Sequence, residues 1–243
     1  MNPRVAKCPL MQYHNNAMQQ YSEPKTQDSY YESRYVYDEG RSGVWASLSR
    51  FLGRFVPPQS SVLEIGAGYC AFINQVQAAK KHALDVSPAF AKHAAPSVKT
   101  HVGSCEDLSA FTAGELDVVF ASNLFEHLTD PMLQRTLAEV RRVLKPAGRL
   151  ILLQPNYRYA YREYFDDYTH VRVFSHVSLV DMLTASGFKA EAVYPRFLPM
   201  TMKSRLPKWP WLVSLYLWLP FRPFARQMLV VAVPDTGGNG AAR

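Results

Sequence analysis

Apolar residues along this chain gather in short runs that end at glycine, proline or polar residues. Continuous runs of this kind are typical of parallel β-strands covered on both faces. Strands are predicted at 61–65, 83–86, 98–102, 116–121, 149–153, 189–194 and 227–233.

Between these runs the apolar spacing changes to that of helices. The strongest helical pattern opens at Asp130 as N-cap, with Pro131 at N1, and carries an apolar stripe. The stripe consists of Leu133, Leu137, Val140 and Leu144. Further helices are predicted at 42–55, after Gly66 through Ala79, and at 175–186 with Gly187 after its end. The alternation predicts an α/β fold: a Rossmann-like, doubly wound, seven-stranded and mainly parallel sheet with one antiparallel edge strand.

Composition limits the partners and the cellular location that we expect for this chain. The net charge is +7, but the basic residues are scattered, so we expect no nucleic-acid partner. The three cysteines, Cys8, Cys70 and Cys105, have no metal-ligand spacing and suit a reducing, cytoplasmic location. We expect neither a signal peptide nor a membrane-spanning helix, since no apolar run reaches 18 residues.

The predicted organisation has four parts. An N-terminal segment at 1–39, expected to be partly mobile, precedes a main domain formed by 40–194 and 227–234. A cap at 195–226 interrupts this domain, and a tail follows at 235–243. The cap is basic and rich in tryptophan.

A glycine-rich turn follows the first strand. Glu64, Gly66 and Gly68 lie in the segment EIGAG, which leads towards the next element. Glycines at such a turn also fit a dinucleotide site, but a carboxylate at 64 would repel a pyrophosphate and suits a ligand with amino and sulfonium groups. Asp85, nineteen residues after Gly66, is placed to bind ribose hydroxyls and fits either ligand.

Five blocks, taken in order, resemble the class I S-adenosylmethionine-dependent methyltransferases. They are 61–68, 84–87, 102–108, 116–128 and 137–151, and the resemblance extends over roughly 40–195. It implies S-adenosyl-L-methionine as cofactor and a methyltransferase activity. The chain departs from the family where Cys70 replaces a frequent glycine and where Ser104 replaces a frequent aspartate.

The resemblance also assigns cofactor contacts. It places the methionine end at the glycine-rich turn, the ribose at Asp85, the adenine at Val86 and 104–106, and the methyl group near 123–124. Tyr35 is a candidate gate residue, although its ring could instead pack on the sheet edge. The implied contacts are Glu64, Gly66, Ala67, Gly68, Asp85, Val86, Ser104, Cys105, Glu106, Asn123, Leu124 and Tyr35.

Two histidines are candidates for the catalytic base. His127 follows the fourth strand and His170 follows the fifth, both at the ligand side of a parallel sheet. His127 could instead cap a turn, and His170 could instead make a loop hydrogen bond. We expect no metal, with Asp166, Asp167 and His170 as an alternative set of cation ligands.

The acceptor is suggested by a looser resemblance. The block 167–175 with the cap is similar to methyltransferases of bacterial surface-polysaccharide biosynthesis. This implies O-methylation of a small molecule or of a nucleotide- or lipid-linked glycan. The alternatives are a quinone or natural product as acceptor, an NAD-dependent oxidoreductase, and a non-catalytic binding subunit. The cap would form a flap over the substrate, a dimer contact, or a peripheral contact with the inner membrane face.

Overall fold

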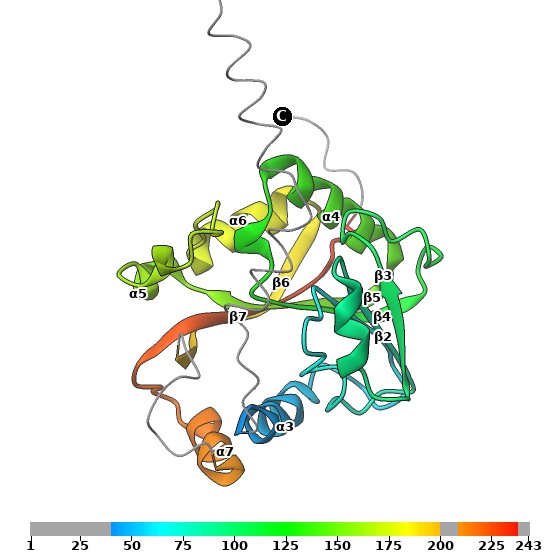
Figure 1. Cartoon of the computed structure of the whole chain (residues 1–243). Coiled ribbons are helices and arrows are strands. Elements are labelled where there is room, and N and C mark those ends of the chain that lie inside the picture. Colours follow the sequence, from blue (N-terminus) through cyan, green and yellow to red (C-terminus); the bar gives the residue numbers. More distant parts are fainter. Residues whose placement is uncertain (1–39, 200–208, 238–243) are drawn as a thin grey trace, which may run out of the picture. The chain divides into compact units, whose positions relative to one another are not determined.

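The computed structural model describes residues 40–199 and 209–237 (Figure 1). Its strands are β1 (Ser61–Ile65), β2 (Lys80–Asp85), β3 (Val98–Val102), β4 (Leu116–Ser122), β5 (Leu144–Pro155), β6 (Phe188–Pro199) and β7 (Ala225–Pro234). The helices with α geometry are α3 (Gly40–Leu52), α4 (Asp130–Val143), α5 (Tyr157–Ala160), α6 (His176–Ala185) and α7 (Pro210–Trp218). Short 3-10 turns are η1 (Pro88–His93), η2 (Phe125–His127) and η3 (Tyr164–Asp166).

The strands form one seven-stranded sheet in the order β3-β2-β1-β4-β5-β7-β6. The pairs from β3 to β5 are parallel, whereas β7 is antiparallel to both of its neighbours. The predicted Rossmann-like, mainly parallel α/β sheet is therefore confirmed. The antiparallel strand, however, lies one place inside the edge, and β6 forms the edge itself.

Burial explains the position of β7. The run from Gln227 to Ala232 is buried throughout, as suits a strand with a neighbour on each side. Most positions of β6 are at least partly exposed, as suits a strand with one neighbour. The prediction of an antiparallel edge strand was wrong in this detail because the returning strand fits between β5 and β6.

Two hydrophobic cores cover the two faces of the sheet, with α4 and α6 on one side and α3 and α7 on the other (Figure 1). Successive strand residues alternate between them: Val119 packs with the α4–α6 core, while Val118 and Phe120 pack with the α3–α7 core. The predicted stripe of α4 is buried as expected at Leu133, Leu137 and Val140.

Several boundaries differ from the prediction. The N-cap of α4 is Thr129, so Asp130 is the first helical residue. Residues 68–75 form turns in place of a helix, because Cys70 has a positive φ of 52° and the amide of Ile73 donates to the Glu64 carboxylate. The α6 prediction is confirmed, with Ser175 as N-cap and Gly187 following at φ 81°.

The cap is partly built into the sheet. β6 runs on to Pro199 and β7 begins at Ala225, so both ends of 195–226 belong to strands. The middle of the cap contributes α7, which packs beside α3 (Figure 1). Within the described residues, no helix combines the length and the apolar character that crossing a bilayer would need.

The first prediction concerns the α3–α7 core. Phe120 is fully buried, stacks on Phe72 at 3.9 Å and meets the edge of Trp45 at 6.1 Å between ring centroids. We expect Phe120→Ala to lower the free energy of unfolding by about 3–5 kcal/mol, because it leaves a cavity beneath the sheet. Urea unfolding measures this loss, and Val177→Ala on exposed α6 surface should change it by less than about 0.5 kcal/mol. A loss below about 1 kcal/mol for Phe120→Ala would contradict the packing described.

Candidate functional site

Polar residues converge at the carboxyl ends of β1, β2 and β4. Parallel pairing places Ile65 opposite Leu84 of β2 and opposite Ala121 of β4. The residues that follow these positions therefore meet at one edge of the sheet. This is the place where open parallel sheets bind ligands, and we refer to it as the crevice.

The two glycines of the turn after β1 are required for different reasons. Gly66 has φ 64°, and a Cβ there would lie 3.0 Å from Cδ1 of Leu124. Gly68 has φ 47°, and a Cβ there would meet no atom of the described part of the chain within 4 Å. Gly66 is therefore closed off by Leu124, whereas Gly68 leaves its backbone accessible to a ligand. Ala67, between them, is buried and donates its amide to the Leu84 carbonyl.

Asp85 links this turn to the end of β2. Its two carboxylate oxygens accept hydrogen bonds from the Gly68 amide, at 2.9 Å, and from the Ser87 amide, at 3.0 Å. A carboxylate oxygen can accept more than one hydrogen bond, so a side chain of this type at this position suits ligand hydroxyls. Val86 follows with 45% of its surface exposed, beside the carboxylate where the resemblance places the adenine.

Glu64 is buried and helps to shape the turn. Its Oε2 accepts the Ile73 amide at 2.9 Å. Burial, with the nearby charges of Glu64 and Asp85, raises the pKa of the Cys70 thiol to about 12. Cys70 is therefore a neutral side chain in a left-handed position, where the family often has glycine.

Side chains of the segment after β3 are engaged with α4 and with the segment itself. Cys105 is buried and accepts a hydrogen bond from Thr136 of α4, at 3.3 Å. Glu106 forms an ion pair with Arg135 of the same helix, at 2.6 Å. Ser104 accepts the Glu106 amide at 3.3 Å. A ligand contact at these three predicted positions would therefore rely largely on their backbone groups.

Asn123 closes the end of β4. It has φ 49°, a conformation that asparagine tolerates better than most residues. Its side-chain oxygen accepts a hydrogen bond from Gln227 of β7, at 2.9 Å. Tyr35, the predicted gate residue, lies outside the described residues.

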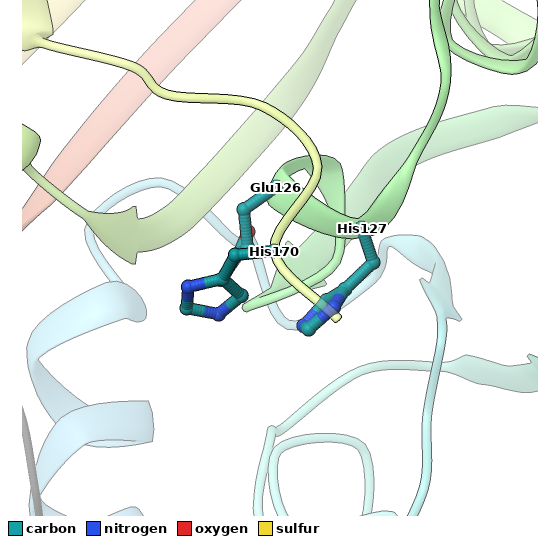
Figure 2. Close-up of side chains that lie close together, drawn as sticks. All are labelled: Glu126, His127 and His170. Atoms are coloured by element: carbon teal, nitrogen blue, oxygen red, sulfur yellow. The ribbon is translucent and has the colours of Figure 1, made fainter. Parts of the chain in front are cut away.

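His127 and His170 come together beside the crevice, with ring centroids 4.8 Å apart (Figure 2). The Glu126 carbonyl brings their segments together, because it accepts the amides of Val171 and Arg172 at 3.0 and 3.2 Å. Both predicted histidines thus belong to one cluster, and His127 lies four residues after Asn123 at the end of β4.

Hydrogen bonds identify the tautomer of each ring. His170 Nδ1 lies 2.5 Å from the Tyr164 carbonyl oxygen. His127 Nδ1 lies 3.0 Å from Thr169 Oγ1 and 3.3 Å from the Thr169 carbonyl oxygen. A carbonyl can only accept, so both Nδ1 atoms carry the proton and both Nε2 atoms carry the lone pair.

The sequence did not single out Glu126 as a site residue. It has no exposed surface, and neither carboxylate oxygen has a hydrogen-bond partner among the described residues. Burial raises the pKa of Glu126 to about 8, and burial followed by the charge of His170 lowers the pKa of His127. The only signal in the sequence was a glutamate between buried Phe125 and Leu128 at the end of a strand.

Glu126, His127 and His170 carry side chains of the types that bind metal ions. Their ligand atoms all lie within 4.8 Å of one another. Asp167 is engaged elsewhere, since its Oδ1 accepts the Thr169 hydroxyl at 2.6 Å and the Thr169 amide at 3.1 Å. Asp166 is exposed. The arrangement therefore favours Glu126 and His127, over the two aspartates, as neighbours of His170.

A separate cavity of about 620 Å³ lies between α3, β6 and α7. Arg54, Arg196 and Arg222 line it together with aromatic rings, and none of the described lining residues is acidic. The Arg222 guanidinium lies 4.9 Å from the Phe197 ring centroid, and burial lowers the pKa of Arg222. The cavity thus combines a partly buried cation with stacking surfaces.

The central part of the chain is similar in sequence to known proteins. Residues 63–152 match a family model described as a methyltransferase domain. The chain is also 31% identical over 141 residues to the reducing polyketide synthase ppsB of Aspergillus oryzae. That match covers 50% of this chain and 6% of the polyketide synthase, so the chain corresponds to a small part of that protein.

Solved structures agree on the fold. A SAM-dependent methyltransferase from Archaeoglobus fulgidus is 18% identical, with a TM-score of 0.60 over 84% of this chain and 97% of that chain. The trans-methyltransferase CalH, solved in complex with S-adenosylhomocysteine (SAH), is 21% identical. Its TM-score is 0.54, over 79% of this chain and 57% of that chain.

The second prediction tests the carboxylate at the end of β2. We expect Asp85→Ala to weaken SAH binding by at least about 100-fold, because it removes a charged acceptor for two ribose hydroxyls. Calorimetric titration measures the affinity. Asp117→Asn is the matched control, because Asp117 binds the Ser61 amide and Lys145 at the other end of the strands. Unchanged affinity in Asp85→Ala would rule out the ribose assignment.

Proposed function

We propose that this chain, which carries a class I S-adenosylmethionine-dependent methyltransferase domain, transfers a methyl group from S-adenosylmethionine to a hydroxyl of a small-molecule acceptor. The observation that carries the proposal is that Gly68 and Asp85 join the carboxyl ends of β1 and β2, while His127 and His170 pair on segments that follow the parallel strands β4 and β5. The acceptor we favour is a glycan or other small molecule that bears phosphate.

The residues of the crevice fit S-adenosylmethionine. Gly68 leaves room for a ligand against its backbone, and Asp85 has lone pairs for ribose hydroxyls. The carboxylate of Glu64 lies beneath the same turn and complements the positive charge of the cofactor. When bound, S-adenosylmethionine supplies an activated methyl group, so the protein has mainly to align the acceptor with it.

The histidine pair supplies what a hydroxyl acceptor needs. A neutral hydroxyl is a weak nucleophile and reacts faster when a neighbouring group takes its proton. The lone pair of His170 Nε2 suits this role, because the hydrogen bond from Nδ1 to Tyr164 holds the ring in the required tautomer. His127 lies beside it and helps to orient the acceptor.

The cavity lined by arginines supports a phosphate-bearing acceptor. Arginine binds phosphate through charge-assisted, often paired hydrogen bonds. Tyr159 connects this cavity to the histidine pair along the chain, since it belongs to α5, directly before the loop that carries His170. A nucleotide- or lipid-linked sugar could place its phosphates between the arginines and its hydroxyl near the crevice.

The cap also presents aromatic side chains at its surface. Trp209, Trp211 and Trp218 are 55%, 61% and 82% exposed, and Phe221 and Phe224 are 67% and 78% exposed. Tryptophan with nearby arginine is favoured at membrane interfaces. We therefore include a peripheral membrane contact through 195–226, which would bring the enzyme to a lipid-linked acceptor.

A second candidate acceptor is a natural product of the polyketide type. The observation in its favour is the 31% identity over 141 residues to part of the polyketide synthase. Such an acceptor lacks phosphate, so the arginines of the cavity would have no role in its recognition.

The third prediction tests the histidine pair. We expect His170→Ala to leave SAH affinity unchanged and to lower methyl transfer by about 100-fold or more, because it removes the proton acceptor. Single-turnover transfer from S-adenosylmethionine and calorimetry measure the two properties. His82→Ala removes a histidine that packs against Phe111 instead, and it should retain activity. Full activity of His170→Ala would exclude a catalytic role.

The fourth prediction tests the arginine-lined cavity. We expect Arg54→Ala and Arg196→Ala each to weaken binding of UDP by about tenfold, since each removes a charged hydrogen bond to phosphate. Arg50→Ala is the matched control, because Arg50 lies in α3, four residues before Arg54, and is outside the cavity lining.

Two ligands, UDP and lipid vesicles, distinguish the possible sources of the phosphate. Binding of UDP supports a nucleotide-linked acceptor, whereas sedimentation with vesicles of phosphatidylglycerol and phosphatidylcholine, without UDP binding, supports a lipid-linked one. If neither ligand binds, the phosphate-bearing acceptor is excluded and the polyketide-type acceptor is favoured.

A further inference from the structure

The cluster of Glu126, His127 and His170 has features that a proton acceptor alone does not require. A base needs one imidazole, but here a second imidazole and a carboxylate lie within 4.8 Å of it (Figure 2). The carboxylate is fully buried and has no hydrogen-bond partner among the described residues. A buried carboxylate without such a partner is costly to fold unless it takes up a proton or a cation compensates its charge.

We propose that Glu126, His127 and His170 bind a divalent transition-metal cation, such as Zn²⁺, at the acceptor side of the crevice. Two imidazole nitrogens and one carboxylate oxygen are a ligand set found in catalytic zinc and non-haem iron sites. Three protein ligands leave coordination positions for substrate oxygen or water.

The hydrogen bonds of both rings orient them for this purpose. Both Nδ1 atoms donate to oxygens of the 164–170 segment, which makes Nε2 the nitrogen of each ring that suits a metal. A chain of hydrogen bonds connects His127 to a carboxylate. Thr169 Oγ1 accepts from His127 Nδ1 and donates to Asp167 Oδ1 at 2.6 Å. Outer hydrogen bonds of this kind, ending in a carbonyl or a carboxylate, fix the orientation of metal-binding histidines.

The geometry needs only a small adjustment. Ligand atoms about 2.1 Å from a common ion lie about 3–3.5 Å apart. One ligand atom of each of the three residues already lies within 4.8 Å of the others, so the side chains need only rotate towards a common ion. The backbone is already held in place, since the Glu126 carbonyl accepts the amides of Val171 and Arg172. Side-chain rotation can therefore complete the site without moving the sheet.

The role of the cation rests on the proposed function, although its binding does not. Coordination to the ion lowers the pKa of an acceptor hydroxyl, whose proton passes to solvent. The oxygen lone pair then forms the bond to the methyl carbon, and the carbon–sulfur electron pair returns to sulfur, which leaves as the thioether of S-adenosylhomocysteine. Under this inference His170 binds the metal and does not itself take the proton.

The test is metal binding by the full chain after treatment with a chelator. We expect one equivalent of Zn²⁺ to bind by calorimetry, and Co²⁺ to give a visible ligand-field spectrum that Zn²⁺ abolishes. Glu126→Gln, His127→Ala and His170→Ala should each weaken Zn²⁺ binding by at least about 10–100-fold, the range already seen for loss of an outer-shell partner. Glu126→Gln is nearly isosteric, and unchanged SAH binding will show that it folds.

Two control variants identify adventitious binding. His82 and His101 form another close imidazole pair, with ring nitrogens 3.2 Å apart, so His82→Ala tests binding there. Asp166→Asn tests the alternative ligand set. Both variants should retain Zn²⁺ affinity. The proposal is overturned if the wild-type chain binds no equivalent of Zn²⁺, if Glu126→Gln and His170→Ala bind normally, or if His82→Ala or Asp166→Asn abolishes binding.

The outcome is independent of the proposed activity. Zn²⁺ binding at this cluster without SAH binding would support the metal site and refute the methyltransferase proposal. SAH binding and methyl transfer by a chain that binds no Zn²⁺ would support the methyltransferase proposal and refute the metal site. His170 would then act as the base.

Discussion

The central constraint on this molecule is that its middle strands are buried on both faces. Every residue of β1 is buried, and alternate residues of β4 pack into opposite cores. Such strands leave no surface along their length for polar chemistry, because an unpaired polar group there would be costly. The groups that contact ligands are therefore confined to the turns at the strand ends, and parallel pairing brings those turns together.

Local sequence could predict the part of the site that lies within single turns. Gly66 and Gly68 follow directly from a strand that ends in a tight turn, and Asp85 lies at the end of the next strand. The fold class follows from the same alternation. The position of β7 could not be predicted, because whether a returning strand takes the edge or the place beside it depends on packing between distant segments.

The histidine cluster shows why the rest of the site was harder to predict. Glu126 and His127 are adjacent in the sequence, but His170 follows 43 residues later, and no spacing rule links them. What joins them is a pair of backbone hydrogen bonds on the Glu126 carbonyl, which any residue type could make. A glutamate at a short turn is normally exposed, so its complete burial becomes visible only in the structure.

The two roles considered for His170 require the same tautomer, so the ring alone does not separate them. Glu126 does. If His170 acted only as a base, the buried Glu126 side chain next to it would take up a proton to avoid a buried charge, and it would contribute nothing to proton transfer. A cation gives this side chain a function, because it provides the positive partner that the described surroundings of Glu126 lack. The burial of Glu126 beside two imidazoles therefore favours the metal site over a base alone.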